Sequence, residues 1–330
     1  MALNHKMNIL VVGGAGYIGS HMVKRLLKDG HHVMVMDNLS KGYRDAVLCK
    51  TFFEIDMADQ SATTKIFSEN PIDAVFHFAS FIEVGESISN PEKYFKNNTE
   101  GTQALLEVMI QFHVKHFIFS STAAIFGSPN YSPIDERHPK SPINPYGQSK
   151  LLVEEMLERF DSTHGLRFVS LRYFNAAGAD PEGELGERHN PETHLIPLVL
   201  QAASGRRDSI SIFGSDYDTL DGTCVRDYIH INDLVEAHMK AITYLRQGHP
   251  SAAFNLGNGK GFSVKQIIEA AEEVTGKKIP FIFDERRIGD PSTLVADASL
   301  ANDVLGWTTE YKDVRDIIKH AWNWERKFPW

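Results

Sequence analysis

A glycine-rich segment near the N-terminus constrains the fold of this chain more than any other feature. Four β-forming residues, Ile9 to Val12, lead into the run Gly13-Gly14-Ala15-Gly16-Tyr17-Ile18-Gly19, and residues 20–27 follow with helical spacing. This order predicts a strand, a tight turn and a helix. The three spaced glycines turn the chain, let backbone approach a pyrophosphate and let the helix pack on the strand. Because the helix N-terminus also offers N–H groups to phosphate, the segment predicts the first unit of a dinucleotide-binding sheet.

An acidic residue follows at the position that such a sheet needs. The predicted second strand, residues 31–36, ends in Asp37 and Asn38, and Asp37 lies 18 residues beyond Gly19. A carboxylate there accepts hydrogen bonds from the adenosine ribose hydroxyls and repels the additional phosphate of NADP, which favours NAD as the cofactor. The alternative is a helix-capping aspartate in an unrelated α/β turn.

Composition excludes several other classes of protein. A length of 330 residues suits one large or two moderate domains, and the net charge of −9 argues against a nucleic-acid partner. Only Cys49 and Cys224 occur, so we expect no disulfide framework and a cytoplasmic location. We expect no membrane span, because no apolar stretch approaches the roughly 20 residues that one needs. Residues 1–6 are too polar for a signal peptide.

Strands and helices continue to alternate along the first half of the chain. This alternation predicts a Rossmann-type, doubly wound parallel α/β sheet whose ligands bind at the carboxyl ends of the strands. Asp56, after the third strand, is then expected beside the adenine. Gly101 lies inside a predicted helix, where glycine is unfavourable, so we expect the helix to pack closely against the sheet there. The further predicted elements are strands at 51–55, 73–79 and 115–120 and helices at 59–69 and 91–112.

Three residues with acid–base potential follow the fifth strand. Thr122 lies at the tip of that strand, and Tyr146 and Lys150 open the next predicted helix at positions i and i+4, which share one face. We expect the Lys150 ammonium to lie near the phenol and, together with a positive nicotinamide ring, to lower the tyrosine pKa from about 10 toward 7. Tyr146 is therefore the candidate general base.

The second half of the chain is predicted to form a smaller C-terminal α/β domain that binds the substrate. We place the NAD-binding domain at 1–175, with 225–255 returning to it, and the second domain at 176–330. The loop 178–192 is rich in glycine and acidic residues, could close on substrate, and leads into a predicted helix at 193–204. His189 and His194 are expected to be polar pocket or surface residues, and we predict no metal site.

Beyond these features, the sequence resembles the extended branch of the short-chain dehydrogenase/reductase superfamily and, within it, the UDP-glucose 4-epimerase family. The resemblance covers nearly the whole chain from residue 8, and its later motifs are specific to the nucleotide-sugar branch. The matching segments are 13–21, 37–39, 84–87, 97–102, 144–147, 172–175, 212–214, 221–223, 225–230 and 287–291.

The resemblance implies reversible oxidation of the sugar at C4. Tyr146 takes the proton of the 4-hydroxyl, Thr122 relays it, and Lys150 holds the nicotinamide ribose, while tightly bound NAD takes the hydride and returns it to either face of a 4-keto sugar. UDP-glucose and UDP-galactose are the implied substrates. The implied NAD contacts are Gly13, Gly16, Tyr17, Ile18, Gly19, Asp37, Asn38, Asp56, Met57, Phe78, Ala79, Ser80, Asn97, Tyr146, Lys150 and Phe174. The implied substrate contacts are Thr122, Asn175, Leu195, Phe213, Arg226, Arg287, Asp290 and Leu294.

Two positions depart from the family pattern. Ile82 stands where many members have a lysine near the cofactor, so NAD retention is expected to be weaker. His194 stands where other members have asparagine. Neither position carries the chemistry. The resemblance also implies a homodimer that pairs through helices around 92–112 and 147–160.

Two other functions remain as alternatives. A nucleotide-sugar 4,6-dehydratase or related lyase needs an additional acid after the threonine, but Ala123 and Ala124 follow Thr122 here. A non-catalytic NAD-binding module has no need of Tyr146, Lys150 and Thr122 together.

Overall fold

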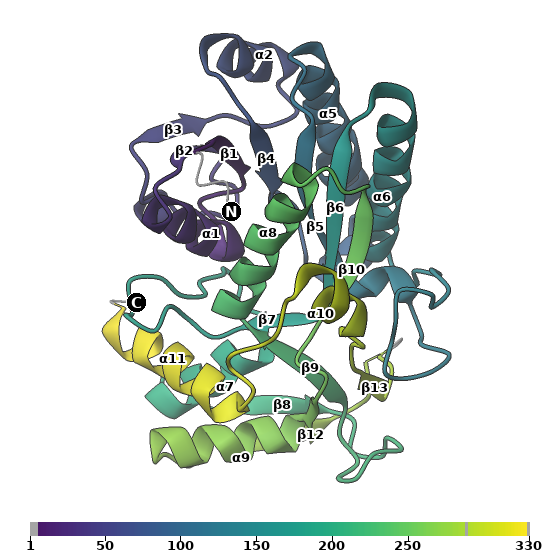
Figure 1. The fold of residues 1–330 in the computed structure, drawn as a ribbon. Coiled ribbons are helices and arrows are strands. Elements are labelled where there is room, and N and C mark those ends of the chain that lie inside the picture. The colour runs from purple at the N-terminus through teal and green to yellow at the C-terminus, as the bar shows by residue number, and fades with distance from the viewer. Residues whose placement is uncertain (1–5, 288–289, 329–330) are drawn as a thin grey trace. The chain divides into compact units, whose positions relative to one another are not determined.

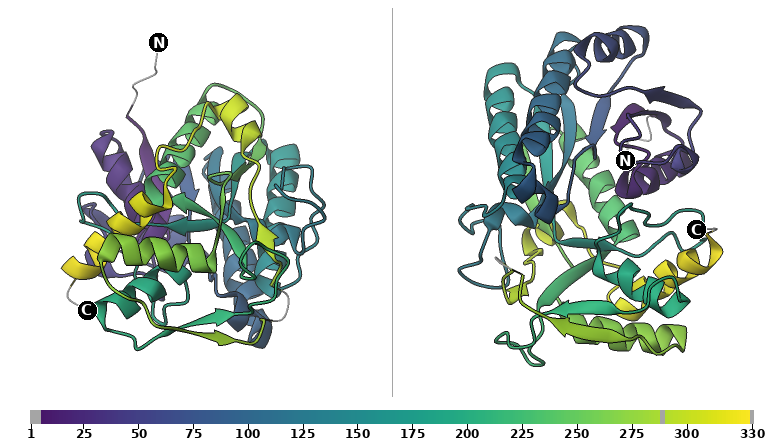
Figure 2. Two further views of the ribbon diagram at one scale, coloured as in Figure 1. Left: turned by 90° about the horizontal axis from the view of Figure 1, so that it is seen from below. Right: turned by 180° about the vertical axis from the view of Figure 1, so that it is seen from behind.

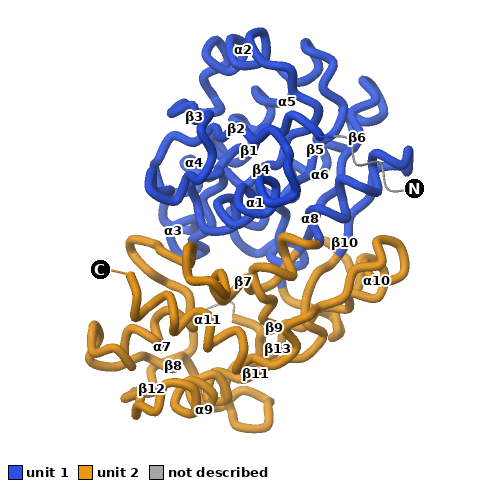
Figure 3. The backbone as a smooth tube through the Cα atoms, turned by 60° about the vertical axis from the view of Figure 1, so that its left-hand side comes forward, with its two compact units in different colours: residues 1–127, 142–172, 237–254 blue, residues 128–141, 173–236, 255–330 orange. Residues whose placement is uncertain are grey.

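The computed structural model describes residues 6–287 and 290–328, which form two compact units (Figure 3). Unit 1 comprises 1–127, 142–172 and 237–254, and unit 2 comprises 128–141, 173–236 and 255–330. The chain therefore crosses between the units several times. Residues 237–254 belong to unit 1, as part of the returning segment 225–255 that the sequence suggested, whereas 225–236 and the loop 128–141 belong to unit 2.

Unit 1 is built on a seven-stranded sheet in the order β10-β6-β5-β4-β1-β2-β3 (Figure 1). Strands β2, β4 and their outer neighbours pair in parallel on either side of β1, so the direction of winding reverses at β1. This confirms the predicted doubly wound α/β fold, and a reversal of this kind places a ligand crevice at the carboxyl ends of β1 and β4. The strands are β1 (Asn8–Val12), β2 (His32–Asp37), β3 (Thr51–Glu54), β4 (Ala74–His77), β5 (His116–Thr122), β6 (Arg167–Tyr173) and β10 (Ala252–Leu256).

Helices cover both faces of this sheet. Alternate side chains of a strand point to opposite faces, and β4 illustrates the result. Phe76 contacts the ring of His238 on α8, whereas His77 contacts Thr102 on α5. The helices are α1 (Tyr17–Lys28), α2 (Gln60–Glu69), α3 (Val84–Ser89), α4 (Pro91–Tyr94), α5 (Thr102–Gln111), α6 (Pro145–His164) and α8 (Ile231–Arg246), with short 3-10 helices at Arg44–Ala46 and Ala123–Phe126.

The predicted helix at 91–112 contains a π-helical segment, Phe95–Gly101, between α4 and α5. Gly101 is the last residue of this π-helical segment, and the side chain of Met57 lies close to it. A Cβ on Gly101 would lie 3.0 Å from the Cε of Met57, so the helix does pack closely here, but on the turn after β3 and not on a strand of the sheet as predicted. π-Helical turns often occur at functional sites, and this one carries Asn97 and Asn98.

Unit 2 contains two small sheets and a helical layer. β9 is the centre of the larger sheet, pairing with β11 and β13 through 225–227 and with β7 through 228–230. β9 thus belongs to unit 2, and β8 pairs with β12 separately. Helices α7, α9 and α11 pack on one another, with α9 and α11 side by side in Figure 2. The elements are β7 (Asn175–Ala177), α7 (Leu195–Ser204), β8 (Ile210–Phe213), β9 (Val225–His230), β11 (Gly261–Ser263), α9 (Val264–Thr275), β12 (Phe281–Asp284), β13 (Thr293–Leu294), α10 (Ser299–Leu305) and α11 (Val314–Lys327).

Among the described residues, none of the helices combines the length and the apolar character that crossing a membrane requires.

Candidate active site

The turn between β1 and α1 accommodates backbone but not side chains. A Cβ on Gly13 would lie 2.5 Å from the backbone nitrogen of Ala79, and a Cβ on Gly19 would lie 2.1 Å from the carbonyl oxygen of Gly13. Gly16 differs, since a Cβ there would meet its nearest neighbour at 3.4 Å. Gly16 is the N-cap of α1 and has no side chain to bond the N–H groups of the first turn. The turn therefore fits a pyrophosphate held by backbone N–H groups.

Acidic side chains extend the predicted NAD site from the glycine turn along the carboxyl ends of β2 and β3. Asp37 accepts hydrogen bonds from the backbone N–H groups of Ala15 at 3.0 Å and Leu39 at 2.8 Å. Burial nevertheless raises the pKa of Asp37 above its ordinary value. Each oxygen keeps a further lone pair for a ribose hydroxyl. Asn38 donates from Nδ2 to Asp56 at 2.8 Å, which joins the two predicted adenosine contacts.

Several other residues predicted to contact NAD pack against, or form hydrogen bonds with, neighbouring residues of unit 1. Met57 is buried, with its sulfur 3.3 Å from Nε2 of His77, and the ring of Phe78 packs against that of His238. Their side chains therefore contribute to the core. Asn97 donates toward the carbonyl oxygen of Ala79 at 3.4 Å. The remaining predicted NAD contacts of this turn, Tyr17 and Ile18, begin α1.

Asn98 holds the loop that follows β4. Its Oδ1 accepts from the backbone N–H of Phe81 at 2.9 Å, and its Nδ2 donates to the carbonyl oxygen of Phe81 at 3.0 Å. Nδ2 also lies 3.1 Å from the hydroxyl of Ser149 on α6. Asn98 therefore ties the loop that follows β4 to the helix that carries Tyr146 and Lys150.

The start of α6 is fixed by features that are local in sequence. Asn144 caps the helix by accepting from the backbone N–H of Gly147 at 2.8 Å, and Pro145 occupies the first turn. A Cβ on Gly147 would lie 2.5 Å from the carbonyl oxygen of Ala124. Because glycine permits this approach, the first turn of α6 packs directly on the residues that follow β5.

This packing brings Tyr146 to Thr122. A hydrogen bond with the Thr122 side chain lowers the pKa of the Tyr146 phenol, but burial has the larger effect and raises that pKa to about 12. Tyr146 still keeps part of its surface exposed. The phenol of the protein by itself is thus protonated at neutral pH.

Lys150 is almost completely buried, with 2% of its surface exposed. Its Nζ donates to the Ser80 hydroxyl and to the carbonyl oxygen of Ser120, both at 2.7 Å. Burial lowers the pKa of Lys150 to about 7, opposed by the negative charge of Glu154. The sequence predicted the ammonium beside the phenol and a lowered tyrosine pKa. In the structure two oxygens of unit 1 hold the ammonium, and burial raises the pKa of the phenol.

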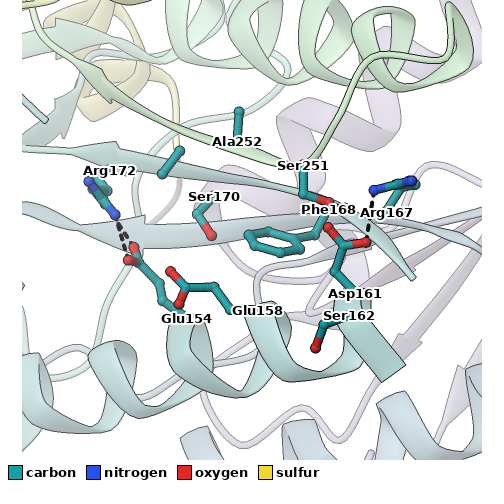
Figure 4. A pocket seen from close by; sticks show the side chains of 11 residues that line it. Glu154, Glu158, Asp161, Ser162, Arg167, Phe168, Ser170, Arg172, Ser251 and Ala252 are labelled. Atoms are coloured by element: carbon teal, nitrogen blue, oxygen red, sulfur yellow. Dashed lines mark hydrogen bonds and ion pairs between the residues drawn. The ribbon is translucent and has the colours of Figure 1, made fainter. Parts of the chain in front are cut away.

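A buried ion pair behind these residues was missed in the sequence. Arg172 donates from two nitrogens to the two carboxylate oxygens of Glu154, at 2.9 and 2.7 Å (Figure 4). Ser121 donates to the same carboxylate at 2.7 Å. The side chains of Glu154 and Arg172 are 3% and 4% exposed. The network joins β5, α6 and β6. One feature of the sequence could have indicated this ion pair: Glu154 lies one helical turn after Lys150, on the same face of the helix.

The predicted substrate contacts of unit 2 form two groups and two separate positions. Arg226 on β9 lies 3.5 Å from a carboxylate oxygen of Asp290, and Leu294 pairs with Arg226 in the β9–β13 register. Arg287 is exposed and places its guanidinium 3.8 Å from the centre of the Phe213 ring. An arginine over an aromatic ring beside an arginine–aspartate pair suits a nucleoside diphosphate.

The two separate substrate contacts are Asn175 and Leu195, and Phe174, a predicted NAD contact, directly precedes Asn175. Asn175 donates to the carbonyl oxygen of Asp227 at 2.9 Å, which fixes β7 on β9. Asp227 is a second residue that sequence reasoning missed: its buried carboxylate accepts from the backbone N–H groups of Asn258, Gly259 and Ala296. Phe174 joins β6 to β7, and Leu195 is the first residue of α7.

The fold and these residues define a dinucleotide-binding enzyme of the short-chain dehydrogenase type, with a threonine, a tyrosine and a lysine at the carboxyl end of β5. Comparison with known proteins gives the family. A model described as the NAD dependent epimerase/dehydratase family matches residues 9–257, and the chain belongs to this family. The predicted resemblance is thereby confirmed.

Individual relatives are similar over almost their whole length. The chain is 54% identical to a UDP-glucose 4-epimerase of Streptococcus mutans over 326 residues, 98% of each chain. It superposes on the crystal structure of a UDP-glucose 4-epimerase from Brucella ovis in complex with NAD with a TM-score of 0.94 and 46% identity, covering 96% of this chain and 97% of that one. The Bifidobacterium longum UDP-glucose 4-epimerase in complex with NAD+ and UDP gives a TM-score of 0.92 at 38% identity, covering 97% and 98%.

Proposed function

We propose that this chain interconverts UDP-glucose and UDP-galactose with tightly bound NAD. The observation that carries the proposal is the hydrogen-bonded pair of Tyr146 and Thr122, with Lys150 on the same helix, in a chain 54% identical to a UDP-glucose 4-epimerase. The glycine turn and Asp37 supply the expected cradle for the dinucleotide. A nucleotide-sugar metabolic role and a cytoplasmic location follow as part of the proposal.

The chain's residues perform the proton transfer. Tyr146 takes the proton of the sugar 4-hydroxyl, and Thr122, hydrogen-bonded to the phenol, positions that hydroxyl and relays the proton. Bound NAD supplies the oxidant for C4 and the reductant that restores either epimer. Because burial holds the phenol pKa near 12 in the chain alone, the charged cofactor must provide the further lowering that lets Tyr146 act as a base.

Lys150 fixes the nicotinamide ribose and contributes positive charge. Its two hydrogen bonds, to Ser80 and to the Ser120 carbonyl, hold the ammonium in place before any ligand binds. Its pKa of about 7 means that the positive charge is partly lost at neutral pH and restored by more acidic solution. In unit 2, Arg226 and Arg287 bind the diphosphate and Phe213 contacts the uracil.

A Tyr146→Phe variant tests the proposal. The variant should lose turnover by several orders of magnitude while still binding NAD and UDP-sugar, because the phenol acts mainly in proton transfer and is only one of many implied NAD contacts. Turnover of UDP-galactose and equilibrium binding of UDP should both be measured. Tyr244→Phe, which removes a hydroxyl elsewhere in unit 1, serves as the control and should keep wild-type turnover. If Tyr146→Phe kept more than about a tenth of wild-type turnover, Tyr146 would not be the base.

The identity of the product separates the proposal from the lyase alternative. Incubation with UDP-galactose should give UDP-glucose, and a 4-keto-6-deoxy sugar would instead indicate a 4,6-dehydratase. The second alternative, a non-catalytic NAD-binding module, would give no product.

NAD should remain bound through the whole cycle, because the hydride removed from C4 is the one returned. Denaturing the purified protein should release NAD, and turnover should proceed without an external oxidant or reductant. Partial dependence on added NAD agrees with Ile82 at the position where many relatives have lysine. Free NADH accumulating in equal amount to product would contradict the cycle.

Leu294 is our candidate for the residue that limits the sugar 2-substituent. It pairs with Arg226 in the β9–β13 register, and an acetamido group forced against a leucine would cost about 1–3 kcal/mol. UDP-galactose should therefore be preferred over UDP-N-acetylgalactosamine in kcat/KM, and Leu294→Ser should narrow the difference. Equal efficiencies in the wild type would show that Leu294 does not limit access.

A homodimer is part of the proposal. Val84 and Ile88 on α3 are 43% and 63% exposed, and α3 packs beside α6, one of the two helices expected at the dimer contact. Sedimentation at micromolar concentration should show a dimer, and a monomer alone would contradict it.

A further inference from the structure

Two histidines and two glutamates converge at the end of the loop that joins β7 to α7 in unit 2. We call Glu187, His189, Glu192 and His194 the His–Glu cluster. Each residue offers one donor atom, and the four donor atoms all lie within 4.8 Å of one another. Two histidines five positions apart do not indicate by themselves that the chain folds back to join them, so the sequence predicted only polar pocket or surface residues here.

The distances between nitrogen and oxygen atoms in the cluster suit one small cation. Nδ1 of His189 lies 3.3 Å from an oxygen of Glu187 and 3.5 Å from an oxygen of Glu192. Nδ1 of His194 lies 3.4 Å from the other oxygen of Glu192 and 2.6 Å from that of Glu187. A tetrahedral zinc ion with bonds of about 2.0–2.1 Å separates neighbouring ligand atoms by about 3.3 Å. Three of the four distances therefore match, and the fourth requires a small side-chain rotation.

The two carboxylates are also shielded from water, whereas the side chains of His189 and His194 are 17% and 40% exposed. The side chains of Glu187 and Glu192 are 5% and 6% exposed. Oxygen Oε1 of Glu187 and Nδ1 of His194 are buried, but within the described part of the chain neither satisfies hydrogen-bond geometry. Buried polar atoms usually have a well-aligned partner. These two atoms lie 2.6 Å apart but do not align with each other as a hydrogen bond.

Charge points to the same occupant. With neutral imidazoles the cluster carries two negative charges, and a divalent cation would neutralise them. Mixed imidazole and carboxylate ligands suit zinc better than the oxygen-preferring magnesium and calcium.

We propose that the His–Glu cluster is a structural site for one zinc ion. Four protein ligands would close the coordination shell, as in structural zinc sites, so the ion would take no direct part in catalysis. His194 is the N-cap of α7 and Leu195 is its first residue. Glu192 already accepts hydrogen bonds from the backbone N–H groups of Thr193 and His194. The ion would fasten the end of the loop to the start of α7.

The test uses full-length protein without a histidine tag. Protein stripped with a chelator is reloaded with zinc sulfate, freed of excess metal and analysed by mass spectrometry for zinc. The wild type should retain about one zinc per chain and gain thermal stability, because zinc binds the folded chain preferentially. Cobalt(II) in place of zinc should give the visible absorption of a tetrahedral ion.

Two variants and one control locate the ion. Glu187→Gln and His194→Asn should each weaken zinc binding by about tenfold or more and abolish the thermal shift. Glu184→Gln is the matched control, because Glu184 lies on the same loop in a separate group of three acidic residues. This control should bind zinc as the wild type does.

Three results would overturn the proposal: failure of the wild type to retain zinc, equal zinc in the wild type and both cluster variants, or loss of zinc in the control alone. In the first case, the cluster is a charged histidine–glutamate network. If a variant fails to fold, anomalous scattering at the zinc edge from a wild-type crystal decides, since the peak must lie among the four side chains. None of these readouts depends on epimerase activity.

Discussion

The buried pair of Glu154 and Arg172 permits a quantitative prediction about the support behind the catalytic residues. Glu154→Gln keeps the size of the side chain but removes its charge, leaving the Arg172 guanidinium buried without compensation. Breaking one partner of a buried pair costs about 3–5 kcal/mol, and this pair is only 3% and 4% exposed. We therefore expect unit 1 of the variant to unfold at distinctly lower denaturant concentration than in the wild type.

Urea unfolding should be followed by circular dichroism and by release of NAD. Glu158→Gln, one turn later on α6 and exposed, is the matched control and should change stability by less than about 0.5 kcal/mol. The double replacement Glu154→Leu with Arg172→Met should recover most of the loss, because it leaves no buried charge. A cost below about 1 kcal/mol for Glu154→Gln would refute the argument that the pair is desolvated.

The same substitution should alter the pH dependence of turnover. The negative charge of Glu154 raises the pKa of Lys150, which burial has lowered to about 7. Without that charge the pKa of Lys150 falls further, and Lys150 loses its proton at lower pH. The alkaline decline of kcat/KM that depends on protonated Lys150 should therefore shift to lower pH, and an unchanged profile would show that Glu154 does not influence the ammonium.

Two further predictions concern the glycine turn and Asp227. Gly16→Ala should fold normally, since its Cβ meets only ordinary contacts, but it should retain less NAD. Gly19→Ala should destabilise unit 1, because its Cβ would lie 2.1 Å from a carbonyl oxygen. Equal thermal stability of the two variants would contradict this prediction. Burial raises the pKa of Asp227 to about 6, so the folded chain binds the proton of this carboxyl group more tightly than the unfolded chain does. The contribution of Asp227 to stability therefore falls as pH rises from about 4 through 6. Asp227→Asn should accordingly be more destabilising at pH 5 than at pH 7.5, by about 1 kcal/mol in urea unfolding, and a reversed order would refute the raised pKa.

The sequence alone determined the features that depend on neighbouring residues. The β1 strand, the glycine turn and α1 follow from local periodicity and from the lack of a side chain at Gly13 and Gly19. The cap of α6 follows from Asn144 and Pro145. The alternation of strands and helices determined the parallel sheet, because parallel strands need crossover helices.

Only the tertiary structure decided which distant residues meet. Lys150 finds Ser80 and the Ser120 carbonyl, 70 and 30 residues away in sequence. β9 became the centre of the second sheet, and the His–Glu cluster formed where a loop turns back to α7. Spacing along a chain cannot predict such contacts, because they depend on how elements pack after folding. The pKa of Tyr146 shows the same limit: sequence indicated a neighbouring positive charge, but the extent of burial set the direction of the shift.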